Sequence, residues 1–76
     1  MTDPVTLDAR GLLCPLPVLK ARKALKARPE GTELLVLSDD PAAVIDFPHF
    51  CAEAGHALLG QNEAGGHFEF RIRKGG

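Results

Sequence analysis

The chain has 76 residues, 45% hydrophobic and 25% charged, which fits one small globular domain over residues 1–76 and excludes a multi-domain or disordered protein. Nine Lys and Arg residues against ten Asp and Glu residues give a net charge of −1, which disfavours attachment to nucleic acid through bulk charge. The two cysteines, Cys14 and Cys51, are too few for the disulfide framework of a small secreted domain and are not spaced as a CxxC motif.

The first residues lack the basic start and apolar run of a signal peptide, and the chain has no apolar run of about 18 residues. We therefore expect a soluble, cytoplasmic, monomeric protein that makes no membrane contact. In that reducing compartment an unpaired cysteine remains a free thiol and becomes a candidate for chemistry.

Alternating apolar and polar residues predict a short strand over residues 5–9, which Gly11 ends. Pro15 suits the first turn of a helix, and residues 16–28 are otherwise good helix formers. Residues 33–38 predict a second strand. Its continuous apolar run is typical of a central strand that is buried on both faces.

A second helix start is indicated by residues 39–41, with Asp as the cap and Pro at the first helical position. Pro48 predicts a kink or a restart within this helix, because proline cannot donate the helical hydrogen bond. Gly55 is expected to end the helix.

Residues 57–61 predict a weak third strand, residues 63–66 a hairpin turn, and residues 67–73 a fourth strand with cleanly alternating polarity. The element order is β-α-β-α-β-β. Strands that interleave with helices and end in a hairpin predict an α/β two-layer sandwich, with a four-stranded mixed sheet and two helices on one face.

Cys14 is the main candidate for chemistry because it stands at the predicted start of the first helix. A thiol is nucleophilic as the thiolate, and the partial positive charge of a helix N-terminus favours that form. Arg10, just upstream, is a candidate for further support of the thiolate. We therefore expect a lowered pKa for Cys14. The alternative is a small apolar residue on the inner face of the helix.

Pro15 and Pro17 are expected to shape this helix start. They remove two of the first N–H groups, so that the N–H groups of Leu16 and Val18 remain for an anionic sulfur. The prolines also stiffen the turn, which would present the sulfur at a fixed angle.

No base lies near Cys14 in sequence, although proximity in space stays open. The histidines His49, His56 and His67 are scattered and are interpreted as surface or turn residues. Simple sulfur exchange is therefore favoured over hydrolytic or acyl-transfer chemistry. No spacing suits a metal, so we expect neither metal nor cofactor. Cys51, beside Phe50, is interpreted as a core residue, with a resolving thiol as the alternative.

The first predicted helix is strongly basic and contains no acidic residue. We interpret it as a docking face for a protein partner, since charge complementarity accelerates encounter and selects partners. The alternative is an ordinary solvated helix face. The candidate partner-binding residues are Lys20, Arg22, Lys23 and Lys26.

Residues 7–17, which end in the motif Cys-Pro-Leu-Pro, resemble the Cys-Pro-x-Pro signature of the TusA-like (SirA-like) sulfur carriers. Residues 39–41, 50–51 and 71–76 also resemble the family pattern. The resemblance implies a fold like that of the C-terminal domain of translation initiation factor 3. It also implies that Cys14 accepts a sulfane sulfur as a persulfide and hands it on, as a stoichiometric carrier in a sulfurtransferase relay.

The resemblance further implies two protein partners, a persulfide donor such as a cysteine desulfurase or a rhodanese-type protein, and a downstream sulfur acceptor. In one branch of the family the sulfur reaches 2-thiouridine in tRNA, and other branches serve sulfur oxidation or molybdenum-cofactor synthesis. That tRNA branch typically has Glu between the two prolines, where this chain has Leu16. The pathway therefore stays open.

Two rival functions also stay open. The terminal Gly75-Gly76 is shared with ubiquitin-like carriers, which hold sulfur as a C-terminal thiocarboxylate, although their fold begins with a hairpin. A nucleic-acid-binding or regulatory module is the second rival. Without Trp or Tyr, and with four Phe that are expected in the core, base stacking is poorly supplied, so we expect no direct nucleic-acid binding.

Overall fold

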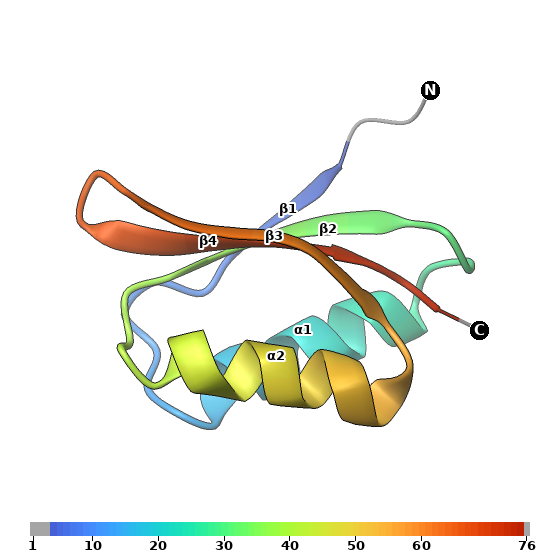
Figure 1. The fold of residues 1–76 in the computed structure, drawn as a ribbon, viewed down its shortest axis with the longest axis horizontal. Coiled ribbons are helices and arrows are strands. Elements are labelled where there is room, and N and C mark those ends of the chain that lie inside the picture. The colour runs from blue at the N-terminus through green and yellow to red at the C-terminus, as the bar shows by residue number, and fades with distance from the viewer. Residues whose placement is uncertain (1–3, 76) are drawn as a thin grey trace.

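The computed structural model describes residues 4–75, which form a four-stranded mixed sheet and two helices (Figure 1). The strand order is β1-β2-β4-β3, with β1 and β2 parallel and the other neighbours antiparallel. This confirms the predicted element order and sandwich. The elements are β1 (Val5–Asp8), α1 (Leu16–Lys26), β2 (Glu33–Ser38), α2 (Ala43–Ala54), β3 (Ala57–Ala64) and β4 (His67–Arg73).

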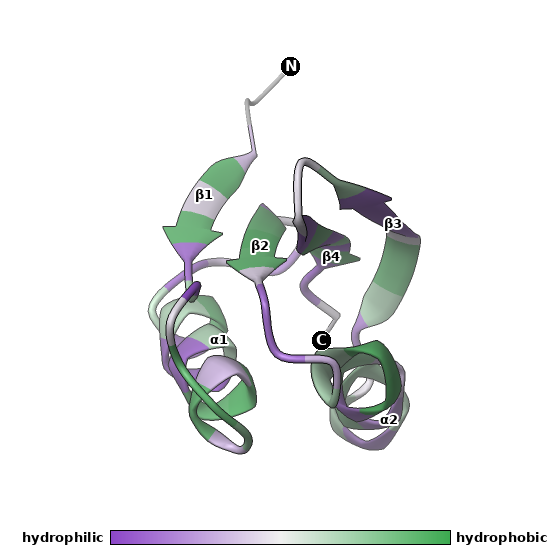
Figure 2. Cartoon of the chain, turned by 90° about the vertical axis from the view of Figure 1, so that its left-hand side faces the viewer, coloured by the Kyte–Doolittle hydropathy of each residue, from purple (hydrophilic) through white to green (hydrophobic). Residues whose placement is uncertain are grey.

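Both helices cover the same face of the sheet, α1 beneath β1 and β2 and α2 beneath β4 and β3 (Figure 2). Along β2, the side chains of Leu34 and Val36 are buried, whereas Leu35 and Leu37 on the other face are partly exposed. The prediction that β2 is a central strand is confirmed. The prediction that it is buried on both faces is wrong, because helices cover only one face.

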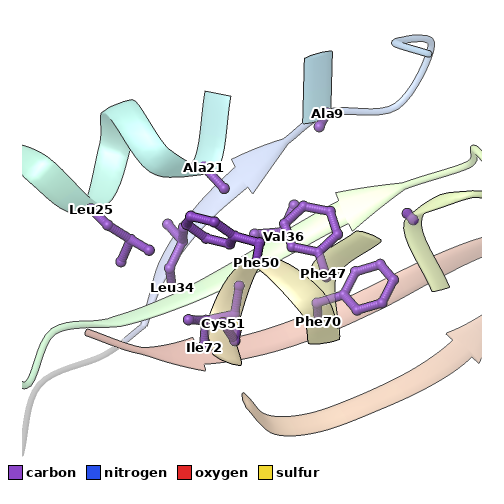
Figure 3. Packing of buried hydrophobic residues seen from close by; sticks show 11 residues of the cluster. Ala9, Ala21, Leu25, Leu34, Val36, Phe47, Phe50, Cys51, Phe70 and Ile72 are labelled. Atoms are coloured by element: carbon purple, nitrogen blue, oxygen red, sulfur yellow. The ribbon is translucent and has the colours of Figure 1, made fainter. Parts of the chain in front are cut away.

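The core lies between the sheet and the two helices (Figure 3). Phe47 of α2 stacks on Phe70 of β4, with ring centroids 4.6 Å apart, and meets Phe50 edge to face at 6.5 Å. Leu25 and Ile72 are also fully buried. Burial of such large side chains is the main stabilising contribution in a domain of this size.

Helix α1 begins one residue later than predicted. Pro15 is the residue before the first helical turn, and Pro17 is the second helical residue. The N–H group of Leu16 donates to the Leu13 carbonyl at 2.9 Å, so a separate turn precedes the helix. Cys14 therefore lies before the cap and not at it.

Helix α2 begins at Ala43, so the prediction of an Asp cap with Pro41 as the first helical residue is wrong, because a separate turn that begins at Asp40 precedes the helix. One carboxylate oxygen of Asp40 accepts the N–H of Ala42 at 3.1 Å, and its carbonyl accepts the N–H of Ala43 at 3.0 Å. The helix runs without a break across Pro48, so the predicted restart is wrong. The helix ends at Gly55, as predicted. Gly55 has a φ of 77°, and glycine adopts this left-handed conformation at little cost.

Strand β3 extends three residues beyond the predicted end and carries an irregularity between Leu58 and Gly60. Gly65 and Gly66 form the tight turn to β4, both with positive φ. Within residues 4–75, neither helix has the length and apolar character that a membrane span requires.

Candidate functional site

Cys14 is exposed on the loop between β1 and α1, which excludes the alternative of an inward-facing core residue. The loop is attached to the start of α2. The N–H group of Cys14 donates to a carboxylate oxygen of Asp40 at 2.6 Å, and that of Gly11 donates to Asp39 at 3.0 Å. Because Asp40 is only 9% exposed, its carboxylate is a fixed anchor for the backbone that carries the thiol.

A groove of about 180 Å³ between the start of α1 and the outer face of α2 opens beside Cys14. We call it the thiol groove. Its walls combine carboxylates, a histidine and a cation with apolar surface. The lining residues are Cys14, Pro15, Val18, Arg22, Asp46, His49, Phe50 and Glu53.

The pKa of the Cys14 thiol is raised above its ordinary value, contrary to the prediction from sequence. The largest cause is a hydrogen bond from the thiol to the Asp46 carboxylate, followed by partial desolvation and by the negative charges of Asp46 and Asp40. A nearby carboxylate disfavours the thiolate because two negative charges would then stand side by side.

Two features of the loop explain why the helix start does not lower this pKa. Cys14 lies outside the first helical turn, and the N–H group of Leu16 that was expected to face the sulfur is bonded to the Leu13 carbonyl. The field of a helix terminus falls off within one turn. The carboxylate of Asp46 instead has the largest effect on the thiol and raises its pKa.

The predicted support of the thiolate by Arg10 is also wrong. The Arg10 guanidinium makes a two-pronged ion pair with Asp8, through hydrogen bonds of 2.9 and 3.0 Å. This pair lowers the pKa of Asp8 to about 2, and Arg10 is not among the charges that act on Cys14. Because the Arg10 guanidinium is paired with Asp8, two residues before it, the guanidinium does not support the thiolate.

The acidic and basic neighbours of Cys14 on α2 were missed by the sequence reasoning. Asp46, His49 and Glu53 follow one another at steps of three and four residues, so they share one helical face. The His49 ring lies 3.1 Å from Glu53 at the edge of the thiol groove. The periodicity of these polar residues was visible in the sequence, and what was missing was the packing of α2 beside the loop of Cys14.

Cys51 is buried in the core, as predicted, and desolvation raises the pKa of its thiol to about 11. A buried thiol with that pKa is almost entirely protonated near neutrality and is a poor nucleophile. These properties favour the packing role over the resolving role.

The basic residues of α1 are all exposed but face different surroundings. The Arg22 guanidinium stands over the Phe50 ring, 5.2 Å from its centroid, and borders the thiol groove. Lys26 lines a neighbouring cavity. The Lys20 ammonium instead lies 3.3 Å from the Asp8 carbonyl, and Lys23 lines neither cavity. The structure therefore divides the predicted docking face into two parts.

Exposed apolar side chains occur on the two segments that meet at the thiol groove, and we call these side chains the apolar rim. Leu13 and Leu16 flank Cys14 in the chain and are 70% and 49% exposed, and Ile45, beside Asp46 on α2, is 76% exposed. Large apolar side chains with this much exposure are typical of a protein-contact surface.

Gly75 at the C-terminal end is held against the domain. Its N–H group donates to His56 at 3.0 Å, and a side chain at this position would collide with the Gly55 carbonyl. Gly76 lies outside the described residues. In the described part of the chain, Phe47, Phe50 and Phe70 are buried and Phe68 is partly buried, so no Phe is available as a stacking platform. Among residues 4–75, no three His, Cys, Asp or Glu side chains are grouped as metal ligands.

Comparisons of this chain with a family model, a curated protein and a solved structure all point to the same family. Residues 5–74 match the family described as sulfurtransferase TusA. The chain is 47% identical over 68 residues to a sulfur carrier protein TusA of Allochromatium vinosum, an alignment that covers 90% of each chain. It also resembles the crystal structure of a SirA-like protein from Desulfitobacterium hafniense, with a TM-score of 0.82, 30% identity, and coverage of 95% of this chain and 99% of the other.

Proposed function

The chain belongs to the TusA family of sulfurtransferases, and from that premise we propose that it carries one sulfane sulfur as a persulfide on Cys14. The observation that supports this most directly is the exposed, unpaired thiol of Cys14 on an anchored loop that also carries the exposed side chain of Leu13. Such a thiol can enter the active site of another protein, and the buried Cys51 cannot.

The transfer is a displacement at sulfur. The Cys14 thiolate attacks the outer sulfur of a donor cysteine persulfide, the donor's S–S bond breaks, and a new S–S bond forms on Cys14. The donor cysteine leaves as a thiolate and takes up a proton. One sulfane sulfur moves and no net oxidant or reductant is consumed. In the second transfer the acceptor's thiolate attacks the outer sulfur of the Cys14 persulfide, and Cys14 leaves as the thiolate.

The surroundings of Cys14 indicate that this step belongs to a complex of two proteins. Since Asp46 and Asp40 favour the neutral thiol, the free carrier is a weak nucleophile. Docking brings the partner's groups against the thiol groove, which removes water and changes the charges that act on the sulfur. The thiol groove is open to solvent and contains no enclosed substrate site, which suits a stoichiometric carrier.

The proposed donor is a cysteine desulfurase or a rhodanese-type protein, and the acceptor is a downstream sulfur-transfer protein. Both are cytoplasmic, where reducing conditions keep Cys14 free. Synthesis of 2-thiouridine in tRNA is one destination. Sulfur oxidation and molybdenum-cofactor synthesis are the alternative destinations. They remain candidates because this chain has Leu16 where the tRNA branch typically has Glu.

The test is to incubate the protein with a cysteine desulfurase and cysteine, and to locate the added sulfur by mass spectrometry of intact protein and peptides. We expect one additional sulfur on Cys14, removable by a reducing thiol. Cys14→Ala and Cys14→Ser should retain the fold and lose all loading, while Cys51→Ala still loads. Sulfur that persists in the Cys14 variants would refute the proposal, and sulfur found at the C-terminus would instead support the thiocarboxylate carrier.

A further inference from the structure

A second cavity, of about 230 Å³, continues from the thiol groove toward the other end of α1. The two share Arg22 and Phe50. We call the second cavity the basic pocket. Its walls contain three cations and a histidine and no carboxylate. The lining residues are Arg22, Leu25, Lys26, Phe50, Ala54, His56 and Lys74.

Three of the four polar side chains of the basic pocket, Lys74, Arg22 and His56, are held by contacts within the domain. The Lys74 ammonium donates to the Arg28 carbonyl at 2.6 Å, and the Arg22 guanidinium is placed over the Phe50 ring. His56 accepts the N–H of Gly75 at its Nδ1 atom, so its neutral ring carries the proton on Nε2. Groups that are already fixed lose little conformational freedom when they bind an anion.

The charges in this pocket lack acidic partners. No ion pair involving Arg22, Lys26 or Lys74 is found among residues 4–75. The pKa of His56 is lowered by burial and then by the charges of Lys74 and Arg22, which shows that both cations act on the pocket. The uncompensated positive charge would be neutralised by an anion from outside the chain.

We propose that the basic pocket receives a carboxylate side chain, Asp or Glu, from the protein that exchanges sulfur with Cys14, and so aligns that protein along the groove between α1 and α2. The proposal rests on the carrier function proposed above. It narrows the predicted docking face to Arg22 and Lys26, leaves out Lys20 and Lys23, and adds Lys74, which the sequence reasoning did not include.

The distribution of charge favours a protein carboxylate over a polyanion. Asp46 and Glu53 line the thiol groove at one end, and the three cations line the basic pocket at the other. A nucleic-acid strand lying along both would place phosphates against these carboxylates, which is unfavourable. A protein surface can present an acidic residue to one end and a basic residue to the other.

The experiment measures the second-order rate of persulfide loading from a cysteine desulfurase, for the wild type and for Lys26→Glu, Lys74→Glu and Lys23→Glu. Each rate is divided by the rate of loading with inorganic polysulfide, a small donor that needs no protein docking. Lys23→Glu is the matched control, since it reverses the same charge on the same helix outside the pocket. Circular dichroism and thermal unfolding establish that each variant is folded.

We expect Lys26→Glu and Lys74→Glu to reduce the normalised rate by about tenfold at low salt, and Lys23→Glu to reduce it by less than about twofold. Equal losses in all three variants would overturn the proposal in favour of general attraction to a basic helix. No loss in Lys26→Glu and Lys74→Glu would overturn it as well.

Two further outcomes identify a different occupant and so overturn the proposal. One is saturable binding of sulfate, seen as an NMR shift at His56, while the desulfurase-driven rates of the wild type and Lys26→Glu remain equal. The other is strongly salt-dependent tRNA binding that Lys26→Glu abolishes. Failure of wild-type Cys14 to load from either sulfur donor would instead refute the carrier function itself, and with it this proposal.

Discussion

Cys14 and Asp46 line the same groove, and the carboxylate of Asp46 raises the pKa of the Cys14 thiol, so the thiol is governed by an acid from the neighbouring helix and not by the helix terminus that follows it. The raised pKa of Cys14 is a direct consequence. Cysteines that are activated permanently have an electropositive environment, with a helix terminus or a basic side chain beside the sulfur. Cys14 has the opposite surroundings, so the sulfur transfer proposed above would require a docked partner to activate the thiol.

Replacing Asp46 by Asn tests this arrangement. The amide keeps the size of the side chain and removes the negative charge, so the pKa of Cys14 should fall and the thiolate fraction at a given pH should rise. We expect alkylation of Cys14 by iodoacetamide at pH 7.5 to become roughly twofold to fivefold faster, since thiolate nucleophilicity falls partly in step with the pKa. The pH profile of alkylation should move to lower pH.

The matched control is Glu30→Gln, which removes an exposed carboxylate. Glu30 lies in the loop after the C-terminal end of α1, whereas Cys14 precedes the N-terminal end of that helix. Its alkylation profile should coincide with that of the wild type. A profile for Asp46→Asn that is unchanged, or shifted to higher pH, would show that Asp46 does not control the thiol.

Asp40, which anchors the loop of Cys14 from the turn before α2, should be more sensitive to substitution than its neighbour Asp39. Alanine at this position leaves the N–H groups of Cys14 and Ala42 without their acceptor, and each lost bond to a carboxylate costs about 1–2 kcal/mol. We expect urea unfolding of Asp40→Ala to give a free energy of unfolding lower by about 2–4 kcal/mol. Faster hydrogen exchange at the Cys14 amide should accompany it.

Asp39→Ala is the comparison for that measurement, because Asp39 is exposed and accepts a single hydrogen bond, from Gly11. Its loss should lower the free energy of unfolding by about 1 kcal/mol or less. Equal destabilisation by the two substitutions would contradict the anchoring role of Asp40.

Cys51 should contribute to stability and not to sulfur transfer. Cys51→Ala removes a buried sulfur atom and leaves a small cavity, which should lower the free energy of unfolding by about 1 kcal/mol. Persulfide loading at Cys14 should retain the wild-type rate. A loading rate that falls severalfold in a folded Cys51→Ala protein would revive the resolving thiol.

Substitutions in the apolar rim should slow docking to the sulfur donor without changing the stability of the domain or the reactivity of the thiol. Ile45 is 76% exposed, so Ile45→Ala should leave thermal stability within about 0.5 kcal/mol of the wild type. Loading from a cysteine desulfurase should slow severalfold, while alkylation by iodoacetamide stays unchanged. Leu59→Ala, on β3, removes another large apolar side chain that is 43% exposed and lies outside the rim, and its desulfurase-driven loading should equal that of the wild type.

The order of the elements was predictable because each change of hydrophobic period is marked by Gly or Pro in the sequence. The alternation over β4 and the stop at Gly55 are local signals, and the structure confirms both. The burial of β2 was not predictable. A run of apolar residues is equally consistent with helices on one or both sides of a strand, and the two helices pack on the same side.

At the site, Cys14 was identified from its neighbours in sequence, but its electrostatic environment was not. The predicted partner, Arg10, is captured by Asp8, two residues away. The groups that do act on the thiol, Asp40 and Asp46, come from the turn before α2 and from α2 itself, which packing brings beside the loop. Local reasoning worked for the helix end at Gly55 and for the hairpin turn, and it failed where contact depends on tertiary structure.

Asp40 binds the N–H of Cys14 with one oxygen and that of Ala42 with the other, and thereby links two segments that are distant in the chain. The nucleophile and the helix that carries its acidic neighbours consequently share one fixed point. A partner that pulled the thiol outward would have to displace the start of α2 as well. We therefore expect the loop of Cys14 and the start of α2 to move as one rigid unit on docking, so that the conformational change needed for a fit would occur in the partner protein.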